Sequence, residues 1–174
     1  NRAIAAQNAE TIAKIAGIDV PAGTAVLMAE ENGAGLDHPF AGEKLSPVSG
    51  VQKAKDLDDA IDKMMACLEY QGKGHSCGIH TNDVEDVNKL AAVAPVTKCV
   101  VNQPQCLTNS GGWDCGFPVS MTLGCGAWGG NSVSHNATWK DLLNFTYVSR
   151  QIPNWKPEKA EDFIDADVIA KVDA

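Results

Sequence analysis

Apolar side chains recur at helical spacing in three stretches of this sequence. Residues 5–16 place isoleucine and alanine on one face, and apolar positions three and four residues apart run through residues 56–70. A third, shorter stretch extends from residue 82 or 83 to about residue 92. Asp56 can cap the second of these stretches, and either Asn82 or Asp83 can cap the third, because these residue types are favoured at helix N-termini. The pattern therefore predicts three amphipathic helices.

The remaining apolar runs are short and are bounded by turn-forming residues. They predict buried strands at residues 24–29, at a run ending near residue 51, at residues 76–81 and at residues 98–102. Along this part of the chain the order is strand, strand, helix, strand, helix, strand. This order predicts an α/β fold with a mainly parallel sheet and flanking helices.

Regular patterning is lost between residues 103 and 134. A segment this long inside a domain is usually functional, and its glycines allow another backbone or a ligand to approach closely. A short helix is predicted at residues 139–143, followed by a strand at residues 146–150 that pairs with another subunit. The tail from residue 153 is acidic, with weak helical character at its end.

Three glycines in this segment have the spacing of a dinucleotide-binding turn. Gly124, Gly126 and Gly129 match G-x-G-x-x-G. That turn works only between a strand and a helix that begins at once, and residues 130–136 are too polar and turn-like to begin one. We therefore interpret the segment as a surface loop that shapes a site built by other segments. A dinucleotide-binding module would require a helix starting near Gly130.

The composition narrows the class of protein. A length of 174 residues fits one domain or part of a larger one, and a hydrophobic fraction of 44% is normal for a protein with a folded core. The net charge of −8, without a basic patch, disfavours nucleic acid and anionic membranes as partners, and no apolar run could span a bilayer. The six cysteines lack C-x-x-C and zinc-ligand spacings, which predicts a reducing, cytoplasmic setting and no metal. The missing initiator methionine predicts a piece of a longer or processed chain.

Four segments, in order along the chain, resemble the motifs of one enzyme family. Residues 43–48 resemble E-x-F-G-P-V, residues 74–83 resemble G-H-T-A-x-I-H-S/T-N-D, residues 100–104 contain V-N-x-P, and residues 123–136 resemble L-G-C-G-x-W-G-G-N-S-x-S-x-N. The first motif is typical of the aldehyde dehydrogenase superfamily, and the others are typical of its CoA-acylating branch. Within that branch the sequence most resembles acylating sulfoacetaldehyde or acetaldehyde dehydrogenases.

The resemblance implies an oxidoreductase that depends on NAD or NADP. Such an enzyme converts a short-chain aldehyde and CoA to acyl-CoA through a cysteine thioester, without a metal. The chain would be the C-terminal part of an aldehyde dehydrogenase-like domain, with a catalytic portion at residues 1–135 and a helix, oligomerisation strand and tail at residues 136–174. The nucleophilic cysteine would lie upstream, so that this chain alone would be inactive. We expect a homo-oligomer in the cytoplasm, either free or inside a bacterial microcompartment.

The resemblance also implies roles for individual residues. Glu43 corresponds to a superfamily glutamate that accepts hydrogen bonds from the nicotinamide ribose, and its alternative is a solvated loop carboxylate. Leu45 stands where the superfamily has a phenylalanine that packs near the nicotinamide. His75 is a catalytic candidate, and its alternative is a structural histidine bonded to the backbone.

The glycine-rich loop contributes the remaining candidates. Cys125 is either a reactive thiol or a loop residue beside the site. The first role requires an activated thiol, because the thiolate is the nucleophilic form. Gly124 and Gly126 shape the substrate loop together with Cys125, and Trp113 lines the aldehyde pocket. Two functions compete with the acylating enzyme: a truncated or split subunit that serves only assembly, and the dinucleotide-binding module.

Overall fold

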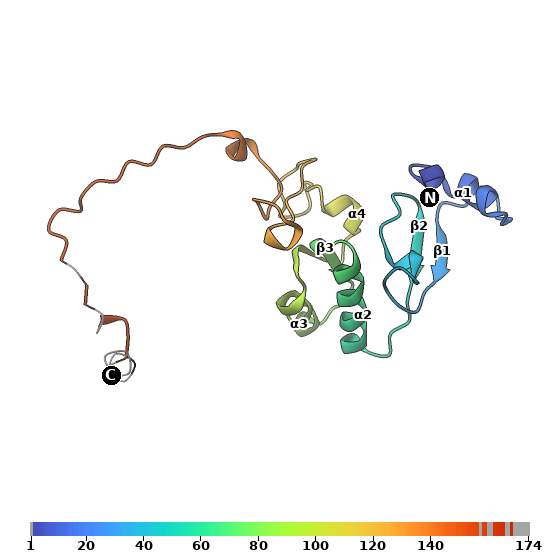
Figure 1. The fold of residues 1–174 in the computed structure, drawn as a ribbon, viewed down its shortest axis with the longest axis horizontal. Coiled ribbons are helices and arrows are strands. Elements are labelled where there is room, and N and C mark those ends of the chain that lie inside the picture. Colours follow the sequence, from blue (N-terminus) through green and yellow to red (C-terminus); the bar gives the residue numbers. More distant parts are fainter. Residues whose placement is uncertain (1, 157, 160–161, 166–167, 169–174) are drawn as a thin grey trace. The chain divides into compact units, whose positions relative to one another are not determined.

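The structure, a computed structural model, describes residues 2–156, 158–159, 162–165 and 168 (Figure 1). The chain divides into two units, residues 1–142 and residues 143–174. The named elements lie in the first unit. In chain order they are η1 (Arg2–Ile4), α1 (Ala9–Ala16), β1 (Leu27–Glu30), η2 (Pro39–Ala41), β2 (Val48–Val51), α2 (Leu57–Tyr70), β3 (Gly74–Ile79), α3 (Val84–Val93), β4 (Val96–Val101), α4 (Gln105–Thr108), η3 (Ala127–Gly129) and η4 (Trp139–Leu142), where η denotes a 3-10 helix.

The three predicted helices are present, and side-chain caps determine where they begin. The Asn8 side chain accepts a hydrogen bond from the Thr11 N–H at 2.8 Å, so α1 begins at Ala9 and not at residue 5 as predicted. Asp56 caps α2 by accepting from the Asp59 N–H at 2.9 Å, and Asp83 caps α3 in the same way. The predicted cap of α2 is thereby confirmed, and of the two candidates for α3, Asn82 and Asp83, the cap is Asp83.

The strands form two separate parallel pairs. Strand β1 pairs with β2, and β3 pairs with β4 in the register that places Cys77 beside Cys99. The predicted α/β class and the parallel pairing are confirmed, and the parallel strands are divided between two small sheets. Short apolar runs identify strands, whereas their pairing depends on tertiary packing, which the runs do not encode.

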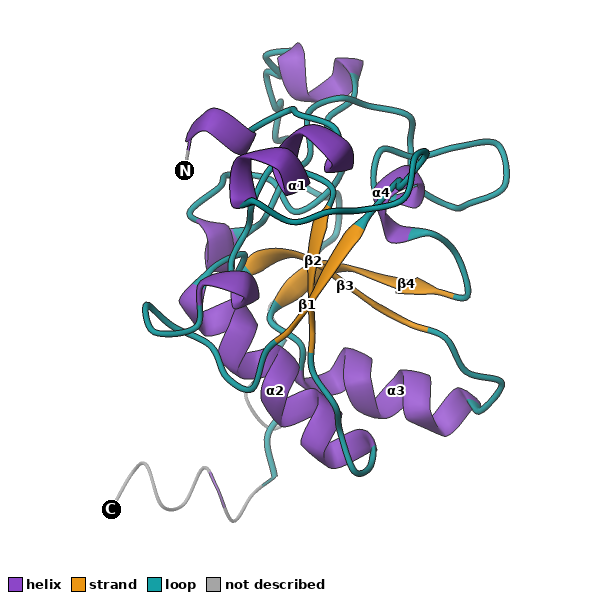
Figure 2. Cartoon of the chain, turned by 90° about the vertical axis from the view of Figure 1, so that its right-hand side faces the viewer, coloured by secondary structure: helices purple, strands orange, loops and turns teal. Residues whose placement is uncertain are grey.

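The β3–β4 sheet has helices on one face and irregular chain on the other. Ile61 of α2, Cys77 of β3 and Leu90 of α3 are buried together in one apolar cluster with Ala94. Figure 2 shows α2 and α3 on one side of these strands and α4 on the other. The sheet therefore separates a packed apolar core from a face on which polar side chains of β3 can meet the following loops.

Residues 103–134, which are predicted to be irregular, contain little regular secondary structure. It contains one short α-helix, α4, and one short 3-10 helix, η3. Leu123 forms an isolated antiparallel bridge with Asn136, which closes the glycine-rich loop. No helix starts at Gly130, which is a left-handed residue ending η3. The dinucleotide-binding interpretation of the G-x-G-x-x-G spacing therefore lacks the helix that it requires.

The second unit differs from the prediction at residues 146–150, which form no strand. A strand is defined by hydrogen bonds to a neighbouring strand, and among the described residues this segment has none. Its apolar side chains are exposed, and Tyr147 has 91% of its surface accessible. The pairing of this segment with another subunit stays a prediction.

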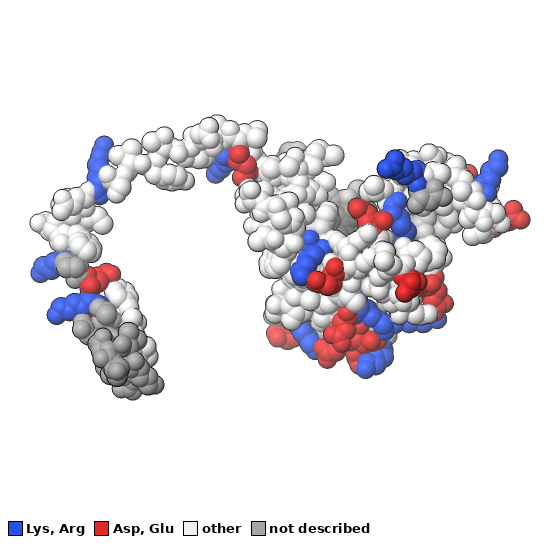
Figure 3. Space-filling view, viewed as in Figure 1, with Lys and Arg blue, Asp and Glu red and all other residues white. Residues whose placement is uncertain are grey.

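Charged side chains of both signs alternate on the surface near the N-terminal ends of α2 and α3. Figure 3 shows acidic side chains gathered there with basic ones between them. Lys89 of α3 pairs with Asp58 of α2, and Lys63 pairs with Asp59 at 2.6 Å. In the described part of the chain, no helix is both long enough and apolar enough to cross a membrane.

Candidate functional site

A pocket of about 690 Å³ brings together two of the residues singled out from the sequence, Glu43 and His75. Residues far apart in the sequence line it, from the loop after η2, the C-terminal end of α2, the start of β3, and α4. The lining residues are Glu43, Leu68, Gln71, Gly72, His75, Ser76, Gln105, Cys106 and Asn109. This pocket is the candidate site.

Glu43 is held at the pocket through its backbone. Its N–H donates to the Gln71 Oε1 at 2.8 Å, which ties the loop after η2 to the end of α2. The preceding residue is Gly42, and a Cβ there would lie 2.6 Å from the same Gln71 oxygen, so a side chain would break the contact. Glu43 itself is exposed, and among the described residues its carboxylate has no ion-pair partner. The carboxylate is therefore available to a ligand.

His75 is oriented by a polar network on the pocket wall. Its Nδ1 lies 2.7 Å from the Ser76 Oγ. The same oxygen accepts hydrogen bonds from the Gln105 Nε2 at 2.8 Å and from the Asn109 Nδ2 at 2.9 Å. Gln105 begins α4 and Asn109, its C-cap in helical conformation, stands four residues later, about one helical turn, so both amides reach one hydroxyl.

A buried asparagine supports this network from behind. Asn136 is only 2% exposed, and its Nδ2 donates to the Asn109 carbonyl oxygen at 2.9 Å and to the Pro118 carbonyl oxygen at 2.8 Å. These bonds fasten the glycine-rich loop to the segment after α4. The side-chain oxygens of Asn109 and Asn136 are buried without a hydrogen-bond partner. The site thus retains unused acceptor capacity, which is uncommon for buried polar groups.

The glycine-rich loop docks on the first residue of β3. Gly74 has φ +91°, and a Cβ there would lie 2.6 Å from the Gly129 backbone nitrogen. The Thr97 hydroxyl donates to the Gly124 carbonyl oxygen at 2.9 Å, and the Lys98 Nζ donates to it at 3.2 Å. Gly124, Cys125 and Gly126, predicted as a substrate loop, therefore lie next to the strand that carries His75.

Lys98 is a buried cation in this region. Its residue is 3% exposed, and the Nζ contacts only neutral oxygens among the described residues. Burial lowers the pKa of its ammonium, an effect that the charge of the Cys125 thiolate opposes. A buried ammonium without a carboxylate partner is costly, so Lys98 is a feature that packing alone does not explain.

The cysteines fall into three environments. Cys125 is half-buried in the loop, where its N–H donates to the Asn131 Oδ1 at 2.8 Å, and it does not line the pocket. Cys106 is exposed and does line the pocket. Cys77 is buried, and burial together with Cys99 raises the pKa of its thiol to about 12. Cys77 is therefore a poor nucleophile at neutral pH.

Two of the predicted residues lie away from the pocket. Leu45 is exposed, adopts a left-handed conformation with φ 49°, and accepts a hydrogen bond from the Ala6 N–H through its carbonyl oxygen. Trp113 is fully exposed. The structure does not bring either side chain to Glu43 and His75, and their roles at the nicotinamide and the aldehyde stay predictions.

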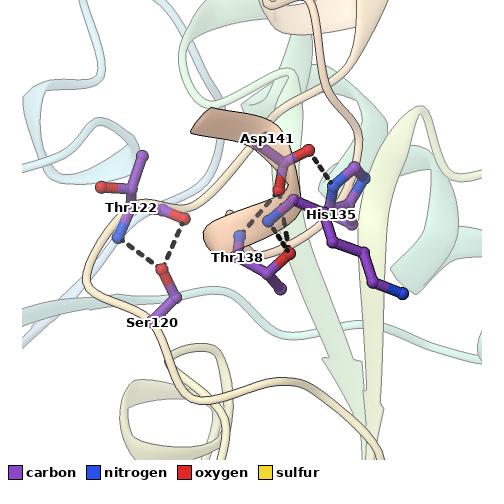
Figure 4. A network of polar contacts seen from close by, with 6 residues as sticks. Ser120, Thr122, His135, Thr138 and Asp141 are labelled. Atoms are coloured by element: carbon purple, nitrogen blue, oxygen red, sulfur yellow. Dashed lines mark hydrogen bonds and ion pairs between the residues drawn. The ribbon is translucent and has the colours of Figure 1, made fainter. Parts of the chain in front are cut away.

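His135 belongs to a network of polar contacts at the end of the glycine-rich loop (Figure 4). Its Nε2 lies 2.9 Å from the Asp141 Oδ1, and the other carboxylate oxygen accepts from the Thr138 N–H at 2.7 Å. These hydrogen bonds lower the pKa of Asp141, the Thr138 N–H contributing most. The network anchors η4 to the end of the glycine-rich loop.

Sequence reasoning missed the residues that orient His75. Ser76 was visible as part of the Gly-His-Ser segment, but Gln105 and Asn109 had no signal because α4 is a four-residue helix without an apolar period. Among the described residues, no group of three or more His, Cys, Asp or Glu side chains could hold a metal ion.

Comparisons with known proteins place these motifs in one family, although no protein-family model matches the chain. The chain is 38% identical over 157 residues to the acylating sulfoacetaldehyde dehydrogenase of Cupriavidus necator, covering 89% of this chain and 32% of that protein. It is 37% identical to the acetylating succinate-semialdehyde dehydrogenase of Clostridium kluyveri, covering 85% of this chain and 32% of that protein.

A solved structure agrees with these relatives. The acetylating aldehyde dehydrogenase of Geobacillus thermoglucosidasius is 34% identical, with a TM-score of 0.77 over 89% of this chain and 35% of that one. The chain thus spans about a third of the length of the relatives that it matches. Over most of its length, the homologues of this chain are acylating aldehyde dehydrogenases.

Proposed function

We propose that this chain forms part of an enzyme that converts a short-chain aldehyde, CoA and NAD(P)+ to acyl-CoA and NAD(P)H through a cysteine thioester. The observation that carries the proposal is that Glu43 and His75, from two separate family-like motifs, line one pocket. Similarity to acylating enzymes over 89% of the chain supports it. The nicotinamide cofactor would supply the hydride acceptor, and no metal would be needed.

Glu43 would bind the ribose of the nicotinamide cofactor. A carboxylate can accept two hydrogen bonds, which suits the vicinal hydroxyls of a ribose. Its backbone is fixed by Gln71 while its carboxylate has no ion-pair partner among the described residues, and the pocket volume of about 690 Å³ can accommodate part of a dinucleotide. The residues present therefore fit a cofactor ribose, and they do not distinguish NAD from NADP.

The aldehyde would be small. Relatives are named for sulfoacetaldehyde and succinate semialdehyde, and acetaldehyde and propionaldehyde are further candidates. We expect residues 103–122, including Trp113, to set the choice of aldehyde, because this segment departs most from the family's motifs. His75 would act at the reacting centre, close to the loop that contains Cys125.

The nucleophilic cysteine would lie in a part of the enzyme outside this chain. The purified chain should then give no CoA-dependent reduction of NAD+ with any of the four aldehydes, followed as NADH absorbance. Formation of NADH would place the working thiol among the six cysteines of this chain, with Cys125 tested first by substitution with serine. That outcome would contradict the proposed division of the enzyme.

A chimera tests the positive half of the proposal. The matching third of an acylating sulfoacetaldehyde dehydrogenase would be exchanged for this chain, and the product should form acyl-CoA and NADH. In the chimera, Glu43→Gln should raise the KM for NAD+ about tenfold, the effect of losing one hydrogen bond to a charged group. Glu69→Gln, an exposed change outside the pocket, is the matched control. A folded chimera without activity would contradict the proposal.

A second role, assembly of subunits, has its own observation in its favour. Residues 145–152 expose Phe145, Tyr147, Val148 and Ile152. Exposed apolar runs of this kind commonly mark protein interfaces, so we propose that the enzyme is a homo-oligomer. If the chain had no catalytic partner domain, assembly would be its whole function. A cytoplasmic location, free or within a microcompartment, remains part of the proposal.

A further inference from the structure

The hydroxyl of Ser76 makes three polar contacts. Their number restricts in which of them the hydroxyl can donate and in which it must accept. A serine hydroxyl has one hydrogen to donate and can accept two hydrogen bonds. The Gln105 Nε2 at 2.8 Å and the Asn109 Nδ2 at 2.9 Å are amide nitrogens, which can only donate. Together they use both acceptor positions of the Ser76 Oγ. The hydroxyl hydrogen is then directed to the third neighbour, the His75 Nδ1 at 2.7 Å.

We infer that Ser76, Gln105 and Asn109 are positioning residues that hold neutral His75 in the tautomer with its proton on Nε2. Because Nδ1 accepts the Ser76 hydroxyl, it carries a lone pair, and the ring proton of a neutral imidazole must be on the other nitrogen. Nε2 is the ring nitrogen that Ser76 does not engage. His75, which lines the pocket, therefore carries its N–H donor at Nε2.

This tautomer determines what His75 can do at the site. A neutral imidazole with Nε2–H cannot take a proton at Nε2, so His75 acts toward the pocket as a hydrogen-bond donor and not as a general base. The matching ligand group is an acceptor oxygen, and in the proposed reaction the carbonyl oxygen of the aldehyde or thioester is of that class. Donors aimed at a carbonyl oxygen stabilise the charge that develops on it. This catalytic meaning depends on the proposed function, whereas the tautomer does not.

The tautomer can be measured directly on the whole 174-residue chain. With ¹⁵N-labelled histidine, long-range ¹H–¹⁵N spectra distinguish protonated from unprotonated ring nitrogens, and His75→Gln assigns the His75 signals. At a pH where the ring is neutral, we expect Nε2 protonated and Nδ1 unprotonated. Ser76→Thr keeps the hydroxyl and should preserve this pattern. Ser76→Ala should release the ring into a mixture of both tautomers.

An amide-to-carboxylate change gives the sharpest test. Asn109→Asp replaces a donor with an acceptor, which should take the Ser76 hydroxyl hydrogen and reverse the tautomer to Nδ1–H. Gln105→Glu should do the same at a less buried position, in case Asn109→Asp does not fold. Gln71→Glu is the matched control, since it adds the same charge to the pocket wall without contacting Ser76.

The outcomes separate this inference from the proposed function. A wild-type spectrum with Nδ1 protonated, or one that Asn109→Asp and Gln105→Glu both leave unchanged, would overturn the inference whatever the activity. If the tautomer is as inferred but the chimera with the acylating enzyme is inactive, the proposed function fails and the positioning network stands.

Discussion

At the scale of single residues, the site combines one free carboxylate with a heavily constrained imidazole. Glu43 is fixed only through its backbone, so its side chain can adjust to a ligand. His75 is fixed through Ser76, which in turn is fixed by the side-chain amides of Gln105 and Asn109. Lys98 and Asn136 are buried polar residues, so their polar groups depend on the surrounding chain for hydrogen-bond partners. Their energetics give two predictions.

Lys98 should make stability rise with pH. Burial lowers the pKa of its ammonium in the folded chain below the usual 10.5, so between the two pKa values the unfolded chain binds more protons and folding is favoured as pH rises. Below the folded pKa the full cost of burying the charge remains. Lys98→Met removes the charge, and the Thr97 hydroxyl still satisfies the Gly124 carbonyl oxygen.

Urea unfolding at pH 7 to 10 measures this effect. At pH 7, Lys98→Met should be as stable as the wild type or more stable, and the difference should shift toward the wild type as pH increases. Lys14→Met, at an exposed position of α1, is the control and should show no such trend. A constant difference between wild type and Lys98→Met across the range would show that Lys98 has no lowered pKa.

Asn136→Ala should destabilise the first unit by about 2–3 kcal/mol. It removes two hydrogen bonds and leaves the Asn109 and Pro118 carbonyl oxygens without these donors in a buried region. Asn88→Ala, at an exposed position of α3, should change stability by less than about 0.5 kcal/mol. Equal unfolding midpoints for the two variants in urea would contradict the structural role of Asn136.

At the scale of elements, the site depends on how one loop docks on one strand. The glycine-rich loop is not held by regular hydrogen bonding, apart from the Leu123–Asn136 bridge and the contacts around it. It is held because Gly74 lets backbone approach backbone, and because Thr97 and Lys98 of β4 reach Gly124. Experiment can separate two contributions of Gly74 to stability, that of its positive φ and that of its close contact with the loop.

Gly74→Ala and Gly72→Ala form a matched pair. Both glycines have positive φ, +91° and +96°, so both substitutions incur the same backbone strain of about 1–2 kcal/mol. At Gly72 the nearest atom to an added Cβ is 3.9 Å away, whereas at Gly74 it would collide with the loop backbone at Cys125 and Gly129. Gly74→Ala should therefore lose additional stability and expose the loop.

Limited proteolysis and urea unfolding together check this pair. Cleavage within residues 123–136 should accelerate in Gly74→Ala but not in Gly72→Ala. If the two variants lose the same free energy of unfolding and are cleaved at the same rate, the loop does not rest on β3.

At the scale of the whole molecule, the chain contains one unit that carries the named elements and a second unit without strands in its described part. The first unit holds the candidate pocket, and the second exposes apolar side chains at residues 145–152. We propose ligand binding for the first unit and self-association for the second, so removing the second should abolish self-association alone.

The full chain should self-associate and a chain ending at Leu142 should not. Analytical ultracentrifugation over a range of concentrations should show an oligomer for the former and a monomer for the latter. Tyr147→Glu should weaken association, because it places a charge on an apolar contact surface, while Arg150→Lys in the same segment should not. Identical sedimentation of the full and shortened chains would contradict the homo-oligomer.

The sequence by itself determined the local features of this protein. Helices α2 and α3 and their caps follow from apolar spacing and from Asp56 and Asp83, because both signals act within a few residues. The family-like motifs likewise singled out Glu43 and His75 without any knowledge of their distance from each other.

Only the tertiary structure decided what these residues meet. It placed Glu43 and His75 on the wall of one pocket, gave Ser76 two amide partners from an unpredicted short helix and the residue that ends it, and divided the strands into two pairs. Each of these results joins segments that are distant in the sequence, and such contacts depend on packing across the fold, which no local spacing of residue types records.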